Sequence, residues 1–451
     1  MAIKSLQQKD SKEYGTLKAL LRYSAQYRDT SYHSTQSSSI PLANKIQQYS
    51  ALGGYFAYKT PSYYNFSLAA TLYTALDVGN NPDDRIGLGG LDETGGSAKS
   101  YAVLGEAYIK YKTQNHDVQF GRREMPDYRF ISLSNIRFSP YTHEGLTYET
   151  NISKNLKINL GYISKQKGRN ATHFKGMVRS ARVNETSIEG SYDTKNYSNG
   201  SYSGKNKAMY MLGVNYKYDT LNLEAWNYYV SDFVNTFYVY GDYNHKINRQ
   251  LSLSVAGQYA KQDDVGGHIA GNIDTSFYGL KAQLAFTKGI TLFSAYNHIA
   301  YNESSYAGGT LFVRWGTPQM FNSFQVQDSE IAGTKSLGVG AQFELGKMGI
   351  LPNTVIRFRY ANYNIPDSLY DKYAHQDRSE ATFDLRYSFE KNDGFGIFTQ
   401  IKGLSLQFRV AYDDYKTDYD YSAYKAVWTN QTFEKVQNDF VDTRLYIDYL
   451  F

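Results

Sequence analysis

The last twelve residues of the chain, 440–451, alternate between two kinds of side chain with a period of two. The odd-numbered positions are apolar apart from Thr443, and the even-numbered positions from 442 to 448 carry Asp, Arg, Tyr and Asp. A period of two predicts a strand with one apolar and one polar face. The chain stops on an aromatic residue, Phe451. A strand that separates lipid from water needs both faces, so we interpret this segment as the closing strand of a transmembrane barrel rather than a soluble edge strand.

The same alternation recurs along the whole chain in segments of about ten residues, the length that crosses a bilayer at a tilt of ~45°. We count eighteen such segments: Tyr14–Arg28, Ala51–Lys59, Phe66–Leu72, Tyr101–Lys112, Val118–Gly121, Glu144–Asn151, Leu156–Lys165, Tyr210–Tyr218, Leu221–Tyr229, Phe237–Lys246, Leu251–Lys261, Ser276–Phe286, Ile290–Ile299, Leu337–Leu345, Val355–Tyr363, Ala381–Phe389, Leu404–Tyr412 and the terminal strand. A soluble sandwich would alternate too, but it would not keep one face apolar through eighteen strands.

These segments predict an all-β fold, a transmembrane antiparallel barrel of about eighteen strands. Residues 1–13 form an N-terminal lead-in, and residues 14–451 form a single barrel. Short turns alternate with long polar loops, of which 166–207 and 300–335 are expected on the outer side. An even strand count places both termini on the periplasmic side. The first strand begins so early that we expect no plug domain, which argues against an energised receptor.

Composition agrees with this prediction. The chain has 451 residues, 45 of them Tyr and 24 Phe, and its mean hydropathy is −0.55. Membrane helices need roughly 18 consecutive apolar residues, which this chain does not contain. Tyrosine at this level suits exposed β surfaces and interfacial girdles. The net charge of +5 is spread along the sequence, so we expect no nucleic-acid partner.

The sequence offers no catalytic or metal-binding motif. It contains no cysteine, and its eight histidines are dispersed without zinc spacing. The acidic run 413–420 lacks the Gly and the closing Glu of an EF-hand loop, so we interpret it as a solvated loop. We therefore expect neither an enzyme nor a cofactor. The N-terminus has no apolar region of a signal peptide, and we take such a signal to have been removed.

Arginine recurs on the polar face of strands that become neighbours when the barrel closes. The predicted basic ladder consists of Arg22, Arg357, Arg359, Arg386, Arg409 and Arg444. A guanidinium binds a carboxylate with two hydrogen bonds and stays charged, which suits substrate binding in a pore. Four aspartates, 384, 413, 442 and 448, share these faces. Pairing with them could instead consume the positive charge, so both readings stay open.

Several stretches resemble a known family. The segment Phe120-Gly-Arg-Arg-Glu-Met-Pro126, followed by 134–145, resembles the inward-folded third loop of OprD-type porins. Residues 228–238, 359–363 and 404–409 are similar to that family in order and spacing, and 308–333 looks like its seventh loop. The resemblance implies an eighteen-stranded, substrate-preferring porin in the outer membrane of a Gram-negative bacterium. It also implies a constriction loop over about 122–144, with Arg122, Arg123, Glu124, Arg137 and Pro140.

The C-terminal residues Leu445, Ile447, Tyr449 and Phe451 resemble the assembly signal of outer-membrane proteins, which implies the barrel-assembly machinery as a partner. The other expected partners are small solutes, outer-membrane lipid and lipopolysaccharide, and a homotrimer is one assembly open to such a barrel. We expect a passive channel for small carboxylate-bearing or zwitterionic nutrients. Two alternatives remain: an unselective general porin, and a surface barrel whose loops serve adhesion. The sequence does not name the solute.

Overall fold

A computed structural model describes residues 14–34, 44–93, 96–131, 137–182, 206–313, 315–316, 320–326, 329–366, 377–389, 402–415 and 436–451. The predicted lead-in 1–13 lies outside these residues, as do 132–136 of the predicted constriction loop and 416–420 of the acidic run.

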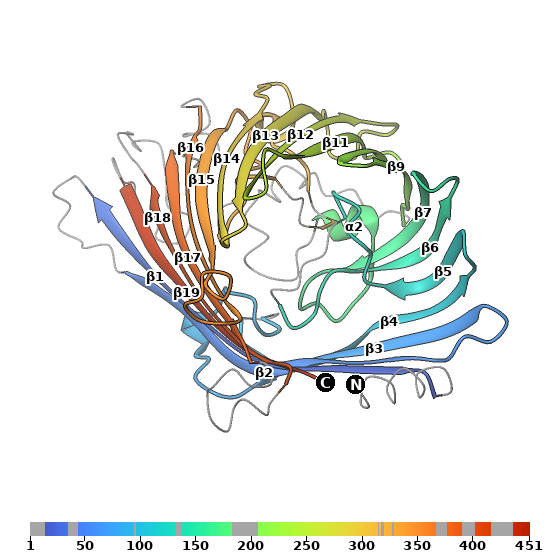
Figure 1. The fold of residues 1–451 in the computed structure, drawn as a ribbon, viewed down its shortest axis with the longest axis horizontal. Coiled ribbons are helices and arrows are strands. Elements are labelled where there is room, and N and C mark those ends of the chain that lie inside the picture. Colours follow the sequence, from blue (N-terminus) through green and yellow to red (C-terminus); the bar gives the residue numbers. More distant parts are fainter. Residues whose placement is uncertain are drawn as a thin grey trace.

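Alternating apolar residues fold the chain into one antiparallel sheet that closes on itself (Figure 1). The strands are β1 (Thr16–Ser34), β2 (Lys45–Lys59), β3 (Phe66–Asp77), β4 (Tyr101–Lys112), β5 (His116–Arg123), β6 (Thr142–Asn151), β7 (Leu156–Lys167), β8 (Lys175–Gly176), β9 (Met209–Tyr218), β10 (Leu221–Val230), β11 (Val234–Lys246), β12 (Leu251–Asp264), β13 (Asp274–Phe286), β14 (Ile290–Ile299), β15 (Lys335–Glu344), β16 (Thr354–Asn364), β17 (Arg378–Ser388), β18 (Leu404–Tyr415) and β19 (Val436–Leu450). The helices are η1 (Asp83–Arg85), α2 (Met177–Arg182) and η3 (Tyr306–Gly309).

The predicted barrel is confirmed. β8 is two residues long and lies against β7, and β7 pairs directly with β9. The wall therefore has eighteen strands, and β19 closes it by pairing with β1 from Leu20↔Leu450 to Ser34↔Val436. Closure pairs every strand on both sides, so no edge is left in the sheet.

The two faces of the wall separate as the alternation predicts. On β1, Leu21 and Tyr27 are exposed on the outer surface, while Arg22, Ser24 and Gln26 between them are buried on the inner side. An apolar surface on the outside of a barrel is stable in lipid and unfavourable in water. The arrangement therefore fits a membrane-spanning wall with a polar interior.

The observed strands extend beyond the predicted ones at the end away from the short turns. β2 begins at Lys45 rather than Ala51, and β1 continues to Ser34 rather than Arg28. Outside the bilayer neither face needs to be apolar, so strand pairing continues there without the signal used to predict it. The loop expected over 166–207 also contains β8 and α2, and α2 lies inside the ring of strands in Figure 1.

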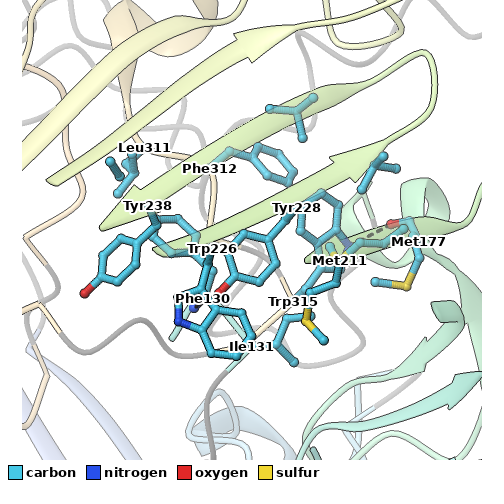
Figure 2. Close-up of a cluster of buried hydrophobic side chains, with 14 of the residues drawn as sticks. Phe130, Ile131, Met177, Met211, Trp226, Tyr228, Tyr238, Leu311, Phe312 and Trp315 are labelled. Carbon is cyan, nitrogen blue, oxygen red and sulfur yellow. Dashed lines mark hydrogen bonds between the residues drawn. The ribbon is translucent and has the colours of Figure 1, made fainter. Parts of the chain in front are cut away.

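A continuous apolar cluster fills part of the interior, against β9 to β13 (Figure 2). Three loop segments contribute to it: Phe130 and Ile131 follow β5, Met177 begins α2, and Trp315 precedes β15. These side chains pack on inward residues of the wall, including Trp226 of β10. The segments are held together by specific polar contacts as well, because Trp315 Nε1 donates to the Met177 carbonyl at 2.9 Å.

Candidate functional site

The seam between β1 and β19 carries a buried ion pair of the predicted ladder. Arg22 and Asp448 stand opposite each other in the register. The guanidinium donates through Nε and Nη2 to the two carboxylate oxygens of Asp448, both at 2.7 Å. A third donor, Nη1, reaches the carbonyl of Arg137 at 3.1 Å. Arg22 thus joins the barrel seam to the segment that follows β5.

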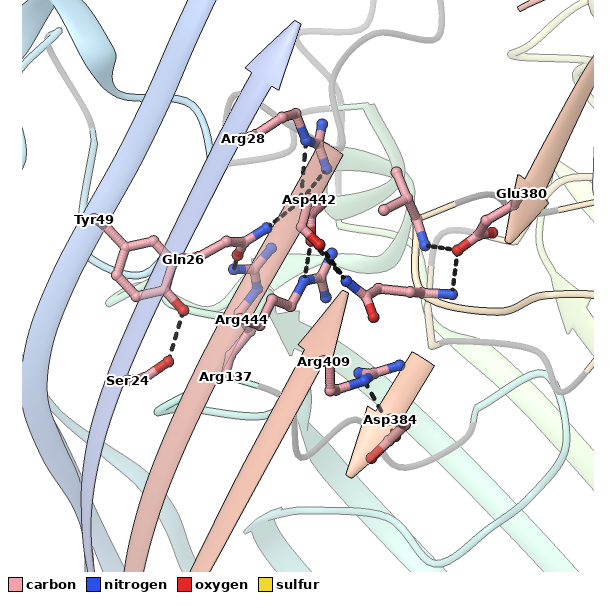
Figure 3. Close-up of polar contacts among 12 residues, drawn as sticks. Ser24, Gln26, Arg28, Tyr49, Arg137, Glu380, Asp384, Arg409, Asp442 and Arg444 are labelled. Atoms are coloured by element: carbon pink, nitrogen blue, oxygen red, sulfur yellow. Dashed lines mark hydrogen bonds and ion pairs between the residues drawn. The ribbon is translucent and has the colours of Figure 1, made fainter. Parts of the chain in front are cut away.

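The carboxylate of Asp442 accepts hydrogen bonds from four side chains, and it is fully buried (Figure 3). One oxygen accepts from Gln26 at 2.7 Å and from Arg28 at 2.8 and 3.0 Å. The other accepts from Arg444 at 2.6 Å and from Gln325 at 3.0 Å. Buried charges are tolerated only when they are paired and hydrogen-bonded in this way. Arg444 of the predicted ladder is therefore buried and compensated by Asp442.

Four ladder arginines line one polar cavity of about 300 Å³, together with Asp384 and Asp448: these are Arg22, Arg357, Arg386 and Arg409. Four cations against two carboxylates leave an excess of two positive charges in this lining. Arg386 is exposed to the interior. Arg357 donates through Nε and Nη2 to Gln342 Oε1 at 3.1 and 2.7 Å. Because glutamine is neutral, these hydrogen bonds do not compensate the positive charge of Arg357.

Arg409 and Arg359 are held differently. Arg409 Nε lies 3.3 Å from Asp384 Oδ2 without hydrogen-bond geometry. Arg359 donates to Thr382 Oγ1 at 3.1 Å, and its guanidinium lies 4.5 Å from the centre of the Phe324 ring. Within the described residues, Arg359 forms no ion pair. A cation above an aromatic face is stabilised without losing its charge, so Arg359 keeps its capacity to attract an anion.

The second half of the predicted constriction loop contacts inward side chains. Arg137 Nη1 donates to Gln26 Oε1 at 3.4 Å, and Phe138 packs in a cluster with Tyr49 and Tyr73. The Nζ of the fully buried Lys167 donates to the carbonyl of Pro140 at 2.9 Å. Contacts with β1, β2, β3 and β7 therefore tie residues 137–140 to the inner surface of the wall.

A larger cavity, of about 720 Å³, lies beside this segment and shares Arg22 and Asp448 with the arginine-lined cavity. Arg137, Pro140 and Glu124 line it, as does Glu106 of β4. Cations and carboxylates thus face one space, and the predicted residues Arg22, Arg137, Glu124 and Pro140 come together there.

Glu124 lies close to a second carboxylate. Its backbone N–H donates to Glu106 Oε1 at 2.8 Å. Burial, with a further contribution from the charge of Glu106, raises the pKa of Glu124 to about 7, and Lys167 acts in the opposite direction. Glu124 therefore changes between its neutral and its negatively charged form near neutral pH.

Two predicted loop residues lie elsewhere. Arg122 is on the same face of β5 as the exposed Phe120, and its Nε donates to Glu144 at 2.8 Å. Arg123 is buried and donates to Thr147 Oγ1 at 3.1 Å. The structure therefore separates Arg122 from the cavity, because adjacent residues of a strand point to opposite faces.

Sequence reasoning did not predict that residues 322–326, before β15, contact the inner wall. Glu380, fully buried on β17, accepts the backbone N–H groups of Gln325 and Val326 at 2.8 and 3.0 Å. Gln325 also donates to Asp442, and Tyr363 donates to the carbonyl of Asn322 at 2.5 Å. Residues 322–326 are thereby fixed to the inner wall between β16 and β19. Glu380 has the inward parity of Asp384, which was the signal available in the sequence.

Other kinds of site find no support in the described part of the chain. It contains no helix long and apolar enough to span a membrane. Among the same residues, no group of three or more His, Cys, Asp or Glu side chains is placed to hold a metal ion.

Comparison with known proteins agrees with the fold. The family model of the OprD outer membrane porins matches residues 60–451. Among solved structures, OccAB3 of Acinetobacter baumannii is 19% identical with a TM-score of 0.72, covering 96% of this chain and 99% of its own. OccK9 (OpdG) of Pseudomonas aeruginosa is 16% identical with a TM-score of 0.71, covering 96% and 98%. OpdK of Pseudomonas aeruginosa, solved with vanillate, is 14% identical with a TM-score of 0.69, covering 97% and 99%.

No curated protein sequence matched this chain. The family match covers most of the chain, and the solved structures share its eighteen-stranded barrel. The chain therefore belongs to the OprD family of outer membrane porins, which are channels of the Gram-negative outer membrane.

Proposed function

We propose that this protein is a passive channel with a preference for small carboxylates, including zwitterions such as amino acids. The observation that carries the proposal is the cavity lined by four arginines and two aspartates, with Arg386 open to the interior. A carboxylate entering a narrow pore loses hydration, and guanidinium groups replace the lost contacts. Several weak sites allow release as well as binding, which conduction requires.

The adjoining cavity supports the extension to zwitterions. Glu106 and Glu124 line it together with Arg22 and Arg137. A solute with both an ammonium and a carboxylate group can interact with the two kinds of side chain at once. A neutral sugar gains neither interaction, so the two cavities favour charged solutes over neutral ones of equal size.

We also propose that residues 122–144 narrow the pore. Contacts of Arg137 and Phe138 with the inner wall support this, as does the packing of Phe130 against Tyr228 of β10 and Tyr238 of β11. Deleting about ten residues around 131–138 should raise the single-channel conductance. An unchanged conductance in a correctly assembled barrel would contradict this proposal.

The selectivity proposal is tested by Arg→Gln changes at 359, 386 and 409 in purified protein reconstituted into liposomes. Uptake of small carboxylates should fall, and the reversal potential in a KCl gradient should shift toward cation preference. Swelling with neutral sugars of similar size should stay nearly unchanged. Arg249→Gln, in the exposed turn after β11, removes one charge away from the cavities and serves as the control.

Equal losses for charged and neutral solutes would show that these arginines only hold the wall together. A wild-type channel without charge or solute preference would instead identify a general porin. A barrel that does not conduct would favour a surface protein whose loops bind a partner.

A further inference from the structure

Three charged side chains form a row across β5, β6 and β7 on the outer face of the wall. Arg122 stands opposite Glu144, and Glu144 stands opposite Lys165. The pair two residues further along β5 and β6, Phe120 and Leu146, is exposed on the outer surface. Because residues two apart on a strand share a face, Arg122 and Glu144 point outward as well, and Lys165 joins them through an ion pair.

This charged row carries more positive than negative charge. Arg122 Nε donates to one oxygen of Glu144 and Lys165 Nζ donates to the other, each at 2.8 Å. The side chains of Arg122 and Lys165 are 40% and 39% exposed. Within the described residues, the terminal Nη groups of Arg122 form no hydrogen bond. Two cations that share one carboxylate leave an excess of one positive charge and several donors able to bind an anion.

An aromatic ring holds the guanidinium of Arg122 in place. Phe174 immediately precedes β8, which pairs with the end of β7. The centre of its ring lies 4.4 Å from Cζ of Arg122. A ring face stabilises a cation and leaves the N–H groups at the edge of the guanidinium able to donate. The donors of Arg122 are therefore positioned before any ligand binds.

The charged row lies at the level where lipid headgroups meet the barrel. Turns 113–115 and 152–155 join these strands at one end, and the row is at the other end, where the long loops begin. Tyr162, three residues before Lys165, is exposed on the outer surface. Its ring lies 5.5 Å from that of Tyr210, which lies 6.5 Å from that of Tyr229. Such a tyrosine girdle marks the interface, and long loops are extracellular, so Lys165 lies just outside the apolar band of the outer leaflet.

We propose that Arg122 and Lys165 bind the phosphate group of a glycolipid in the outer leaflet, of the kind found in the lipid A part of lipopolysaccharide. A guanidinium binds phosphate with two parallel hydrogen bonds, and an ammonium group adds a point charge. The acyl chains then lie along the exposed Phe120 and Leu146. Free phosphate lacks this apolar contact. The inference is independent of the proposed solute preference, because the site is on the outside of the barrel.

The test uses the full-length protein, freed of lipid in detergent micelles, and measures the apparent Kd of the first bound lipid by native mass spectrometry. The probes are lipid A, lipid A without its phosphates, and inorganic phosphate. Arg122→Gln and Lys165→Gln should each weaken binding of lipid A about fivefold, and the double variant should weaken it further. Binding of dephosphorylated lipid A should be weak in the wild type and unchanged in the variants. Lys154→Gln, in the exposed turn at the other end of β6 and β7, is the matched control.

Glu144→Gln distinguishes a lipid site from a row that only ties the strands together. Without the carboxylate both cations are available to phosphate, so lipid A should bind about two- to fivefold more tightly. A purely structural row predicts unchanged or weaker binding. Arg122→Lys keeps the charge but loses the paired donors, so it should be intermediate, and it provides a folded variant should the double variant assemble poorly.

Three results would overturn the inference. The first is wild-type affinity for lipid A in the double variant. The second is an equal loss in Lys154→Gln, which would assign the binding to general surface charge. The third is equal affinity of the wild type for lipid A and for either of the other two probes, which would show that binding does not require a phosphate attached to a lipid.

Discussion

Two sectors of the same barrel wall have opposite interiors. In the polar sector, formed by β1 and β16 to β19, the inward positions carry arginines and acidic residues that share hydrogen bonds or form ion pairs (Figure 3). In the apolar sector, formed by β9 to β13, the inward positions carry Trp, Tyr, Met and Phe, and loop segments pack on them (Figure 2). In both sectors the outward positions alternate with the inward ones and are mostly apolar.

The difference indicates how the pore acquires its position. Apolar inward residues attract apolar loop residues and exclude water, so loop residues fill the space beside Trp226 and Tyr228, whereas a cavity of about 340 Å³ remains beside the polar inward residues Asp242 and Gln283. Guanidinium and carboxylate groups lose too much hydration to be covered completely, so the polar sector retains cavities. We propose that the conducting path follows the charged wall, and the predictions below compare the two sectors.

The largest effect is expected at the seam of the polar sector, where β19 closes the barrel. Tyr449 stands opposite the outward Leu21, and the rings of Tyr449 and Phe451 are 4.2 Å apart. Removing Phe451, or changing Tyr449→Asp, should leave the chain unassembled, because the outward face of the last strand loses its apolar end. Heat-modifiable migration of outer-membrane protein on gels measures this. Leu450→Asp, one residue along on the opposite face, is the control, and assembly of Tyr449→Asp at wild-type level would contradict the prediction.

The next largest effect is a loss of stability from one substitution in the interior of each sector. Asp442→Ala leaves Arg28 and Arg444 without their shared carboxylate, which should lower the free energy of unfolding by about 3–5 kcal/mol. Trp226→Ala empties space in the apolar cluster and should cost a similar amount, about 3–5 kcal/mol. Urea unfolding of the barrel in lipid vesicles measures both.

The two losses should respond differently to a second change. Adding Arg444→Met to Asp442→Ala removes an uncompensated buried charge, so the double variant should be more stable than Asp442→Ala alone. The same Arg444→Met change should not rescue Trp226→Ala. If the stability losses of Asp442→Ala and Arg444→Met simply add in the double variant, Asp442 acts through packing and not through charge.

A smaller effect is expected where a loop segment crosses the polar sector. Glu380→Ala removes the acceptor of two backbone N–H groups, at Gln325 and Val326, and should release the segment at a cost of about 1–3 kcal/mol. Single-channel records should then show more frequent current fluctuations. Glu380→Gln keeps one side-chain oxygen as an acceptor and should be intermediate. Quiet records from Glu380→Ala would show that Asn322 and Tyr363 hold the segment without Glu380.

The fold could be predicted from the sequence because each strand carries its own signal. Alternation assigns Leu17 and Leu21 to one face and Arg22 to the other without knowledge of any neighbour. The strand ends were less predictable. Beyond the bilayer, residues such as Lys45 continue the pairing with polar side chains on both faces.

The site could be predicted only in part, because it depends on contacts between strands and loops. The inward parity of the arginines is local, but the pairing of Arg22 with Asp448 requires the register across 426 residues. The contact of Gln325 with Asp442 requires a loop to cross the interior. The sequence left open whether aspartates compensate the arginines. The structure has Arg444 paired within its own strand and Arg386 exposed.

The smallest expected effect is a pH dependence from the loop beside the larger cavity. The pKa of Glu124 is raised to about 7, above its usual value, by burial and by the nearby Glu106. Below that pH Glu124 is neutral, and above it the carboxylate adds one negative charge to a space that also contains Arg22 and Arg137. The ratio of anion to cation permeability should therefore fall as the pH rises from 6 to 8, by less than about twofold because mobile ions screen a single charge.

Reversal potentials in a KCl gradient at several pH values measure this ratio. Glu124→Gln stays neutral throughout, so its ratio should match that of the wild type at pH 6 and should not fall at pH 8. Glu303→Gln, on an exposed loop, should keep the wild-type dependence. A dependence that survives in Glu124→Gln would assign it to another group and would leave Glu124 as a structural member of the loop. A dependence of the opposite sign would mean that the carboxylate, once charged, pairs with a neighbouring cation and opens the path for anions instead of repelling them.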